Sequence, residues 1–193
     1  MKSRIRKCIS SAVNNYTCFL EDPNLQEDIE NIVKLSINAF KNDKKMLFCG
    51  NGGSASDAQH IAAELSGRFY VNRPPLYAEA LHVNSSYITA VANDLGYNET
   101  YARILEACGK KGDILVGIST SGNSLNVVKA LIKANELGLT TIGLTGSKEC
   151  KMDSVCDIMI KSPSNDTPRI QETHILIGHI ICQLIEEEMF PNA

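Results

Sequence analysis

The segment Phe48–Glu64, FCGNGGSASDAQHIAAE, is the clearest indication of how this chain folds. A short apolar lead gives way to glycines at positions 50, 52 and 53, and serines then open a segment with helical periodicity. Glycines permit tight turns close to a ligand, and a helix N-terminus offers unpaired N–H groups to an anion. A strand, a glycine loop and a helix in this order indicate an α/β protein whose first loop can hold a phosphate group.

This first loop has several possible uses. It lacks the Gly-Lys-Ser/Thr of a Walker A loop. It matches G-x-G-x-x-A through Gly50, Gly52 and Ala55, and Glu79 would then be the acidic residue of a dinucleotide site. A plain structural turn is another interpretation. Ser54 and a second serine add hydroxyl donors, so the loop is also able to hold a sugar phosphate without a lysine.

A second loop, ISTSGNS at 118–124, makes a sugar phosphate the favoured ligand. It places four hydroxyls at another strand-to-helix junction, where a helix cap requires only one. Because parallel strands end at one edge of a sheet, both loops are expected to form one pocket for a phosphate and the neighbouring sugar hydroxyls. The alternative to a phosphate-binding loop is that one serine caps the helix and the other three hydroxyls have no role in binding. The four residues are Ser119, Thr120, Ser121 and Ser124.

Strand patterns alternate with helix patterns along the rest of the chain. Alternation of this kind implies parallel pairing with right-handed crossovers, and therefore a doubly wound parallel α/β sheet. Residues 1–193 form one predicted domain, with a helical hairpin in 1–44 and the α/β core and a long last helix in 45–193. The strands are predicted at 45–50, 76–83, 113–120, 140–146 and 156–162.

Three helix boundaries are predicted from capping residues. The helix after the first loop starts near Ser56 and ends at Gly67. A serine caps the helix that begins at residue 85. The last helix starts near Pro168 with Thr167 as its cap. This last helix is apolar nearly all round, so we expect another subunit to bury part of it.

Composition limits the class of protein. The net charge is −3, which argues against a nucleic-acid partner. The seven cysteines are odd in number and form no CxxC, so reduced thiols in a cytoplasmic protein are expected rather than disulfides or a cysteine zinc site. No signal peptide is visible, and the longest apolar run, 175–185, is too short to cross a bilayer. A soluble protein without a membrane partner is predicted.

Two histidines, a glutamate and a glutamine form a candidate reactive cluster. His60 and Glu64 share a helix face, and Gln171 and His179 project to similar sides of the last helix. If the two helices meet, these donors suit zinc, although glutamine is an unusual ligand. The alternatives are a surface His–Glu bond, a core role for His179 in competition with His174, or a metal-free acid/base pair of Glu64 and His179.

Five motifs spread over nearly the whole chain belong together: CGNGGSASDAQHIAAELSGRF, VANDLGYNETYAR, GDILVGISTSGNSLNVVKA, TIGLTG and RIQETHILIGHI. In this order they resemble the bacterial phosphoheptose isomerases, which are sugar isomerase (SIS) domain proteins. The resemblance implies a SIS-type, flavodoxin-like three-layer sandwich and a cytoplasmic homotetramer with active sites where subunits meet.

The resemblance also implies an activity. Family members convert sedoheptulose 7-phosphate to D-glycero-D-manno-heptose 7-phosphate through an enediol(ate), the first step toward ADP- or GDP-heptose for lipopolysaccharide or other surface sugars. One zinc ion per subunit and no nucleotide cofactor are expected, with His60, Glu64, Gln171 and His179 as the metal ligands. Glu64 and His179 match the acid/base pair. The substrate residues by motif match are Asn51, Gly52, Gly53, Ser54, Glu64, Arg68, Asn93, Asp94, Ser119, Thr120, Ser121, Ser124 and Gln171.

Two points separate this chain from its relatives. Some relatives carry an acidic residue where Pro168 stands here, so no carboxylate role is expected at that position. The DnaA initiator-associating protein of the same superfamily is a binding partner rather than an isomerase, and it lacks matches to Glu64 and His179. Because both residues are present here, an enzyme is favoured over a non-catalytic binding protein. An isomerase of another phosphosugar remains the alternative.

Overall fold

Five parallel strands form the central sheet of the computed structural model, which describes residues 1–193. Their order is β2-β1-β3-β4-β5, so the doubly wound parallel sheet predicted from the sequence is confirmed. The strands are short and β1 and β3 are fully buried, as expected for a sheet covered on both faces. Their bounds are β1 Met46–Gly50, β2 Ala78–Ala80, β3 Ile114–Ile118, β4 Thr140–Thr145 and β5 Ile158–Lys161.

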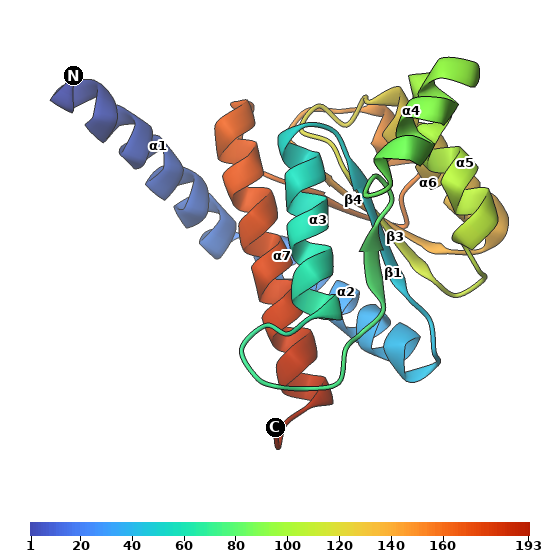
Figure 1. The fold of residues 1–193 in the computed structure, drawn as a ribbon. Helices are drawn as coiled ribbons and strands as arrows, with labels where there is room; N and C mark the ends of the chain where they lie inside the picture. The colour runs from blue at the N-terminus through green and yellow to red at the C-terminus, as the bar shows by residue number, and fades with distance from the viewer.

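Helices cover both faces of this sheet (Figure 1). One apolar core lies between the sheet and α2, α3 and α7, and the other lies between the sheet and α5 and α6. The predicted three-layer sandwich is therefore confirmed. The helices are α1 Lys2–Glu21, α2 Pro23–Lys41, α3 Gly53–Ser66, α4 Ser85–Asp94, α5 Thr100–Cys108, α6 Leu125–Leu137 and α7 Thr167–Met189, with short 3-10 turns at Tyr97–Glu99 and Lys151–Ser154.

Helices α3 and α7 run side by side in the same direction on one face (Figure 1). Both follow a strand and start at the carboxyl edge of the sheet, which gives them a common direction. They pack closely at Gly178, where an added Cβ would lie 2.4 Å from Cδ1 of Ile61. Since this pair of helices carries the candidate reactive cluster, their relative position is central to the site.

The N-terminal helices are joined at Asp22, whose carboxylate accepts the N–H groups of Asn24 and Leu25 at the start of α2. Helix α1 then extends away from the body (Figure 1). The C-terminal part of α1 contacts the start of α7, where Asn15 Nδ2 donates to Thr173 Oγ1 at 2.6 Å. Most of α1 is exposed, including the apolar residues Ile5, Ile9, Val13, Tyr16 and Leu20.

Three predicted helix boundaries need correction. Helix α3 begins at Gly53 rather than near Ser56, because the glycine loop itself makes the first turn. Asn84 caps α4 in place of the serine, and its side chain accepts the N–H of Tyr87 at 3.0 Å. Thr167 is the first residue of α7 and Asp166 is at the cap position. The end of α3 at Gly67 is as predicted.

No helix combines the length and apolar character that a membrane span requires.

Candidate active site

The two hydroxyl-rich loops lie side by side at the carboxyl edge of the sheet. In the β1–β3 ladder, Gly50 pairs with Ile118, so the loops that follow these strands start as neighbours. The strand after β1 lies on one side of β1 in the sheet, and the strand after β3 lies on the opposite side of β3. The direction in which successive strands are added therefore reverses between β1 and β3. Such a reversal leaves a crevice at the strand ends, which is where open α/β sheets bind ligands.

An amide pair holds the two loops together. Asn51 and Asn126 exchange hydrogen bonds, with Asn51 Nδ2 donating at 2.8 Å and Asn126 Nδ2 donating back at 2.9 Å. Tyr97 OH also donates to Asn51 Oδ1 at 2.8 Å. The Asn51 side chain therefore orders the loops in this structure. Sequence analysis missed Asn126 because an asparagine in the first turn of a helix has no distinctive pattern.

The serine loop presents its hydroxyls as a cluster. Ser119 Oγ lies 3.0 Å from Ser124 Oγ and 3.5 Å from Ser121 Oγ. On the facing loop, Ser54 is buried in the first turn of α3, and Gly52 has φ +57°, a conformation that other residues rarely adopt. Hydroxyls and helix N-termini on two neighbouring loops are suited to a phosphate group.

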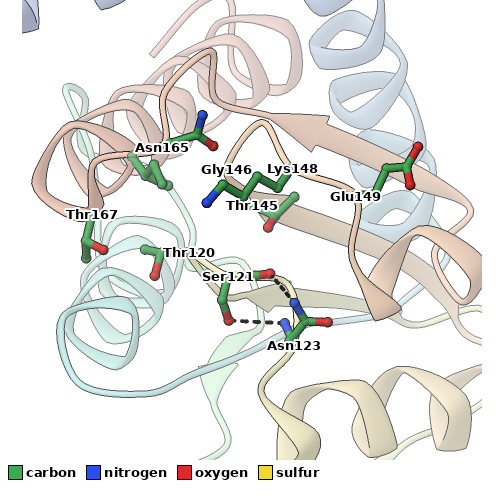
Figure 2. Close-up of a pocket in the computed structure, with 10 residues that line it drawn as sticks. Thr120, Ser121, Asn123, Thr145, Gly146, Lys148, Glu149, Asn165 and Thr167 are labelled. Carbon is green, nitrogen blue, oxygen red and sulfur yellow. Dashed lines mark hydrogen bonds between the residues drawn. The ribbon is translucent and has the colours of Figure 1, made fainter.

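A polar pocket of about 220 Å³ extends from the serine loop over the end of β4 (Figure 2). Thr145 Oγ1 is buried at this pocket without a hydrogen-bond partner, so a ligand oxygen bound there would satisfy it. Of the lining residues, only Thr120 and Ser121 were predicted as site residues. The other eight were not predicted, because they come from separate loops and helix starts that only the fold brings together: Asn123, Thr145, Gly146, Lys148, Glu149, Asn165, Thr167 and Ile170.

His60 lies between the two predicted acid/base residues. Its Nε2 is 3.0 Å from Oε1 of Glu64, and its ring centroid is 5.1 Å from that of His179 in an edge-to-face arrangement. The ring of Phe69 also packs against His179, at 5.8 Å between centroids. The side chains of His60 and Glu64 are 48% and 25% exposed, so solvent and a ligand can reach them.

Asp57 is a further carboxylate near this cluster. It lies on α3 three residues before His60, and its Oδ2 is buried without a partner. Burial raises the pKa of Asp57, and the nearby His60 partly opposes the increase. Sequence analysis did not select Asp57, because a single aspartate within a helix carries no signal of its burial.

Gln171 does not join the His60–Glu64–His179 cluster within one chain. It packs against Gly53 at the start of α3, where an added Cβ would lie 2.2 Å from its Nε2. His179 is eight residues further along α7, a rise of about 12 Å. No three His, Cys, Asp or Glu side chains of this chain converge in metal-binding geometry. The donor types at the cluster suit zinc, but a single chain does not bring the four predicted ligands together.

The remaining predicted residues lie at the surface. Arg68 is exposed just beyond the end of α3. Asn93 and Asp94 are exposed at the end of α4, where Asn93 Nδ2 donates to Asp94 Oδ1 at 2.8 Å. The following turn carries Tyr97, which bonds to Asn51, so this end of α4 lies near the first loop.

The cluster and the hydroxyl-rich loops are separated along α3. Glu64 is 11 residues beyond Gly53, a rise of about 16 Å. A seven-carbon sugar phosphate has nine bonds from C1 to a phosphate oxygen and extends about 11 Å, by analogy with the reach of an extended backbone. The loops and the cluster of one chain are therefore far apart for a single substrate.

Comparison with known proteins identifies the family. A family model described as "SIS domain" matches residues 14–146. The chain is 48% identical over 192 residues to the phosphoheptose isomerase of Aneurinibacillus thermoaerophilus, covering 100% of this chain and 97% of that one. Two solved phosphoheptose isomerases have the same fold. That of Neisseria gonorrhoeae has a TM-score of 0.90 at 37% identity, covering 96% of this chain and 98% of that one.

The second structure, from Francisella tularensis, has a TM-score of 0.91 at 33% identity, covering 96% of this chain and 97% of that chain. The chain is therefore a SIS-domain protein. Within that class it belongs to the phosphoheptose isomerase family, because the similarity extends over its full length at this identity.

Proposed function

We propose that this chain is an aldose–ketose isomerase that converts sedoheptulose 7-phosphate to D-glycero-D-manno-heptose 7-phosphate. Its membership of the phosphoheptose isomerase family supports this activity. The observation that carries the proposal is the cluster of Glu64, His60 and His179 on two adjoining helices. A carboxylate and an imidazole on either side of a ligand are the groups that proton transfer between two carbons requires.

The reaction moves one proton between neighbouring carbons. Glu64 removes the proton from C1 of the ketose, which leaves a cis-enediol(ate), and the proton returns at C2 as the aldehyde forms at C1. His179 transfers a proton at the substrate oxygens, so the negative charge on oxygen is neutralised as it develops. His60, which bonds to Glu64, orients the carboxylate. The isomerisation is redox-neutral overall, since C1 is oxidised as C2 is reduced.

The two hydroxyl-rich loops supply orientation rather than chemistry. The hydroxyls of Ser119, Ser121 and Ser124 bind the phosphate, and the neighbouring pocket over β4 accommodates further hydroxyls of the ligand. Fixing the phosphate end holds the reacting carbons near the acid/base pair, which lowers the entropic part of the barrier.

Zinc remains a proposal that rests on donor types. His60, Glu64 and His179 offer two imidazoles and a carboxylate. Gln171 of the same chain lies apart from them, so the set would be completed only by the Gln171 of another subunit. A bound ion would polarise the carbonyl and hydroxyl oxygens of the substrate. Metal content should be measured in the wild type, His60→Ala and His179→Ala. Zinc in the wild type that is lost in both variants supports the site, and equal, negligible zinc in all three rejects it.

A homotetramer is supported by apolar surface that one chain leaves exposed. Ile5 and Ile9 on α1 are 53% and 60% exposed. An apolar groove of about 480 Å³ lies where α1, α2 and α7 meet, with Leu176, Ile180 and Leu184 on its α7 side. Surface of this kind marks an interface, and further copies of the chain are the expected partners.

Assembly also bears on the active site. Because the loops and the cluster of one chain are far apart, we place each active site where the loops of one subunit face the Glu64–His179 pair of another. The product then feeds nucleotide-heptose synthesis for lipopolysaccharide or capsule in the cytoplasm.

The activity is tested by incubating the protein with sedoheptulose 7-phosphate and following the anomeric protons by NMR. New aldose resonances that depend on Glu64 support the proposal. Turnover of a different ketose phosphate, with none of the heptulose, would retain the isomerase mechanism and change the substrate.

A further inference from the structure

A buried ion pair joins the end of α7 to the segment that follows α3. Glu186 is 3% exposed, and its carboxylate accepts three consecutive backbone N–H groups. These come from Phe69, Tyr70 and Val71 at 3.1, 2.6 and 3.0 Å. Arg73 Nε donates to the same carboxylate at 2.8 Å. We call Glu186 and Arg73 the clasp.

Arg73 uses its other donors on the end of α3. Its guanidinium donates to the carbonyl oxygen of Leu65 at 2.8 Å and to that of Glu64 at 2.9 Å. The side chain is fully buried, with Phe190 packed against the guanidinium at 5.6 Å. The last turn of α3 is therefore held by a residue that is itself anchored to α7.

The clasp contacts a group next to each acid/base residue, namely the backbone of Glu64 and the residue that packs against His179. Through Arg73 it binds the backbone of Glu64. Through Glu186 it binds the N–H of Phe69, whose ring packs against His179. We propose that Glu186 and Arg73 are positioning residues that fix the carboxylate of Glu64 and the imidazole of His179 relative to each other. This role rests on the proposed isomerase function.

Stability alone is a weaker explanation for this arrangement. A buried ion pair often contributes little net stability compared with apolar residues of the same size. Burial raises the pKa of Glu186, but the three N–H bonds and Arg73 outweigh it and hold the pKa below its usual range. The carboxylate thus stays charged at neutral pH, and its hydrogen bonds to the loop are charge-assisted and therefore strong.

The chain offers a matched control. Lys45 and Asp113 form a second buried ion pair, with 2.5 Å between Nζ and Oδ2 and side chains 9% and 2% exposed. Asp113 also accepts the backbone N–H groups of Lys45 and Lys110, much as Glu186 accepts those of its loop. This pair precedes β1 and β3 and, unlike the clasp, makes no hydrogen bond to α3 or α7.

The test compares Glu186→Gln with Asp113→Asn in steady-state kinetics, corrected for the folded fraction by circular dichroism. Misplacing a reacting group by about 1 Å costs on the order of 100-fold, so kcat of Glu186→Gln should fall 10- to 100-fold at nearly unchanged KM. Asp113→Asn should keep its kcat. An unchanged kcat in Glu186→Gln, or an equal loss in both variants, overturns the proposal. If Glu186→Gln does not fold, Arg73→Lys, which keeps the charge, replaces it.

A second readout separates failure of the clasp from failure of the isomerase function. The chain has four histidines, few enough for their imidazole C–H resonances to be assigned and followed individually by NMR. In Glu186→Gln, those of His60 and His179 should shift while that of His82 stays in place, and Asp113→Asn should shift neither of the first two. Unshifted resonances of His60 and His179 overturn the proposal even if the wild type shows no turnover.

Discussion

At the scale of single residues, His60 connects the two side chains on which the proposed chemistry depends. Its ring lies against both Glu64 and His179, although the two residues are 115 positions apart in the chain. Sequence spacing predicted that His60 and Glu64 share a helix face, and the 3.0 Å contact confirms it. The approach of His179 depends on how two helices pack, which the residue pattern does not specify.

Glu64→Gln should abolish most of the activity while preserving the fold. The amide keeps the shape of the carboxylate and its contact with His60, but it cannot accept a proton from carbon. Loss of a general base lowers kcat by about 10²- to 10⁴-fold. The anomeric-proton NMR assay measures the effect. Glu187→Gln, an exposed substitution on α7, is the control and should retain full activity.

At the scale of helices, the site depends on how closely α3 approaches α7. Gly178→Ala should separate them, because the new Cβ would lie 2.4 Å from Cδ1 of Ile61, which is only 3% exposed. Overpacking lowers the free energy of unfolding by about 1–3 kcal/mol. Helix propensity alone would instead raise it by about 1 kcal/mol, so the sign is diagnostic. Urea unfolding measures the change.

Removing Cδ1 of Ile61 tests whether this contact causes the loss of stability in Gly178→Ala. Ile61→Val removes Cδ1, so Gly178→Ala/Ile61→Val should recover part of the lost stability and activity. A double variant as unstable as the sum of the two single variants would show that the contact with Ile61 is not the cause.

The elements were predictable from the sequence because their patterns are local. The strand Met46–Gly50 and the helix end at Gly138, which adopts φ +76°, follow from apolar runs and glycine placement. The predicted caps of α4 and α7 were one residue off, and the start of α3 was three residues off. Which of several neighbouring polar residues caps a helix depends on backbone geometry that the sequence pattern does not specify. The pocket over β4 was not predictable, since it depends on tertiary packing. The separation of Gln171 from His179 along α7 follows from their eight-residue spacing, but the packing of Gln171 against Gly53 depends on the fold.

At the scale of the whole molecule, stability should decrease on mild acidification because of His174. Burial lowers the pKa of this imidazole to about 4, with a smaller opposing effect from its bond to the Thr145 carbonyl. Unfolding returns the pKa to about 6.5, so the unfolded chain binds one more proton between these values. The stabilisation from burying neutral His174 is complete above pH 6.5. As the pH falls to 4, the free energy of unfolding declines by about 3 kcal/mol.

The measurement is urea unfolding at pH 7, 5.5 and 4 for the wild type and His174→Gln. In this variant the introduced glutamine amide can still donate to the carbonyl oxygen of Thr145, but it does not titrate between pH 4 and 7. The wild type should lose more stability than the variant on acidification. Parallel losses in the two proteins would assign the acid sensitivity to other groups.

Shared active sites predict complementation between inactive subunits. Glu64→Gln and Ser121→Ala/Ser124→Ala should each have little activity alone. If a site combines the loops of one subunit with the cluster of another in a symmetric pair, random co-assembly leaves about a quarter of the sites intact. Co-expression followed by the NMR assay measures the recovery. If each chain forms its own site, mixed oligomers contain no intact site and show no recovery.

The most direct test of the account is conversion of the seven-carbon ketose phosphate itself. Purified protein is mixed with sedoheptulose 7-phosphate, and the anomeric region of the proton NMR spectrum is followed over time beside Glu64→Gln. The account predicts aldose resonances with the wild type and almost none with the variant. An unchanged spectrum with folded wild-type protein, or equal conversion by both proteins, would contradict it.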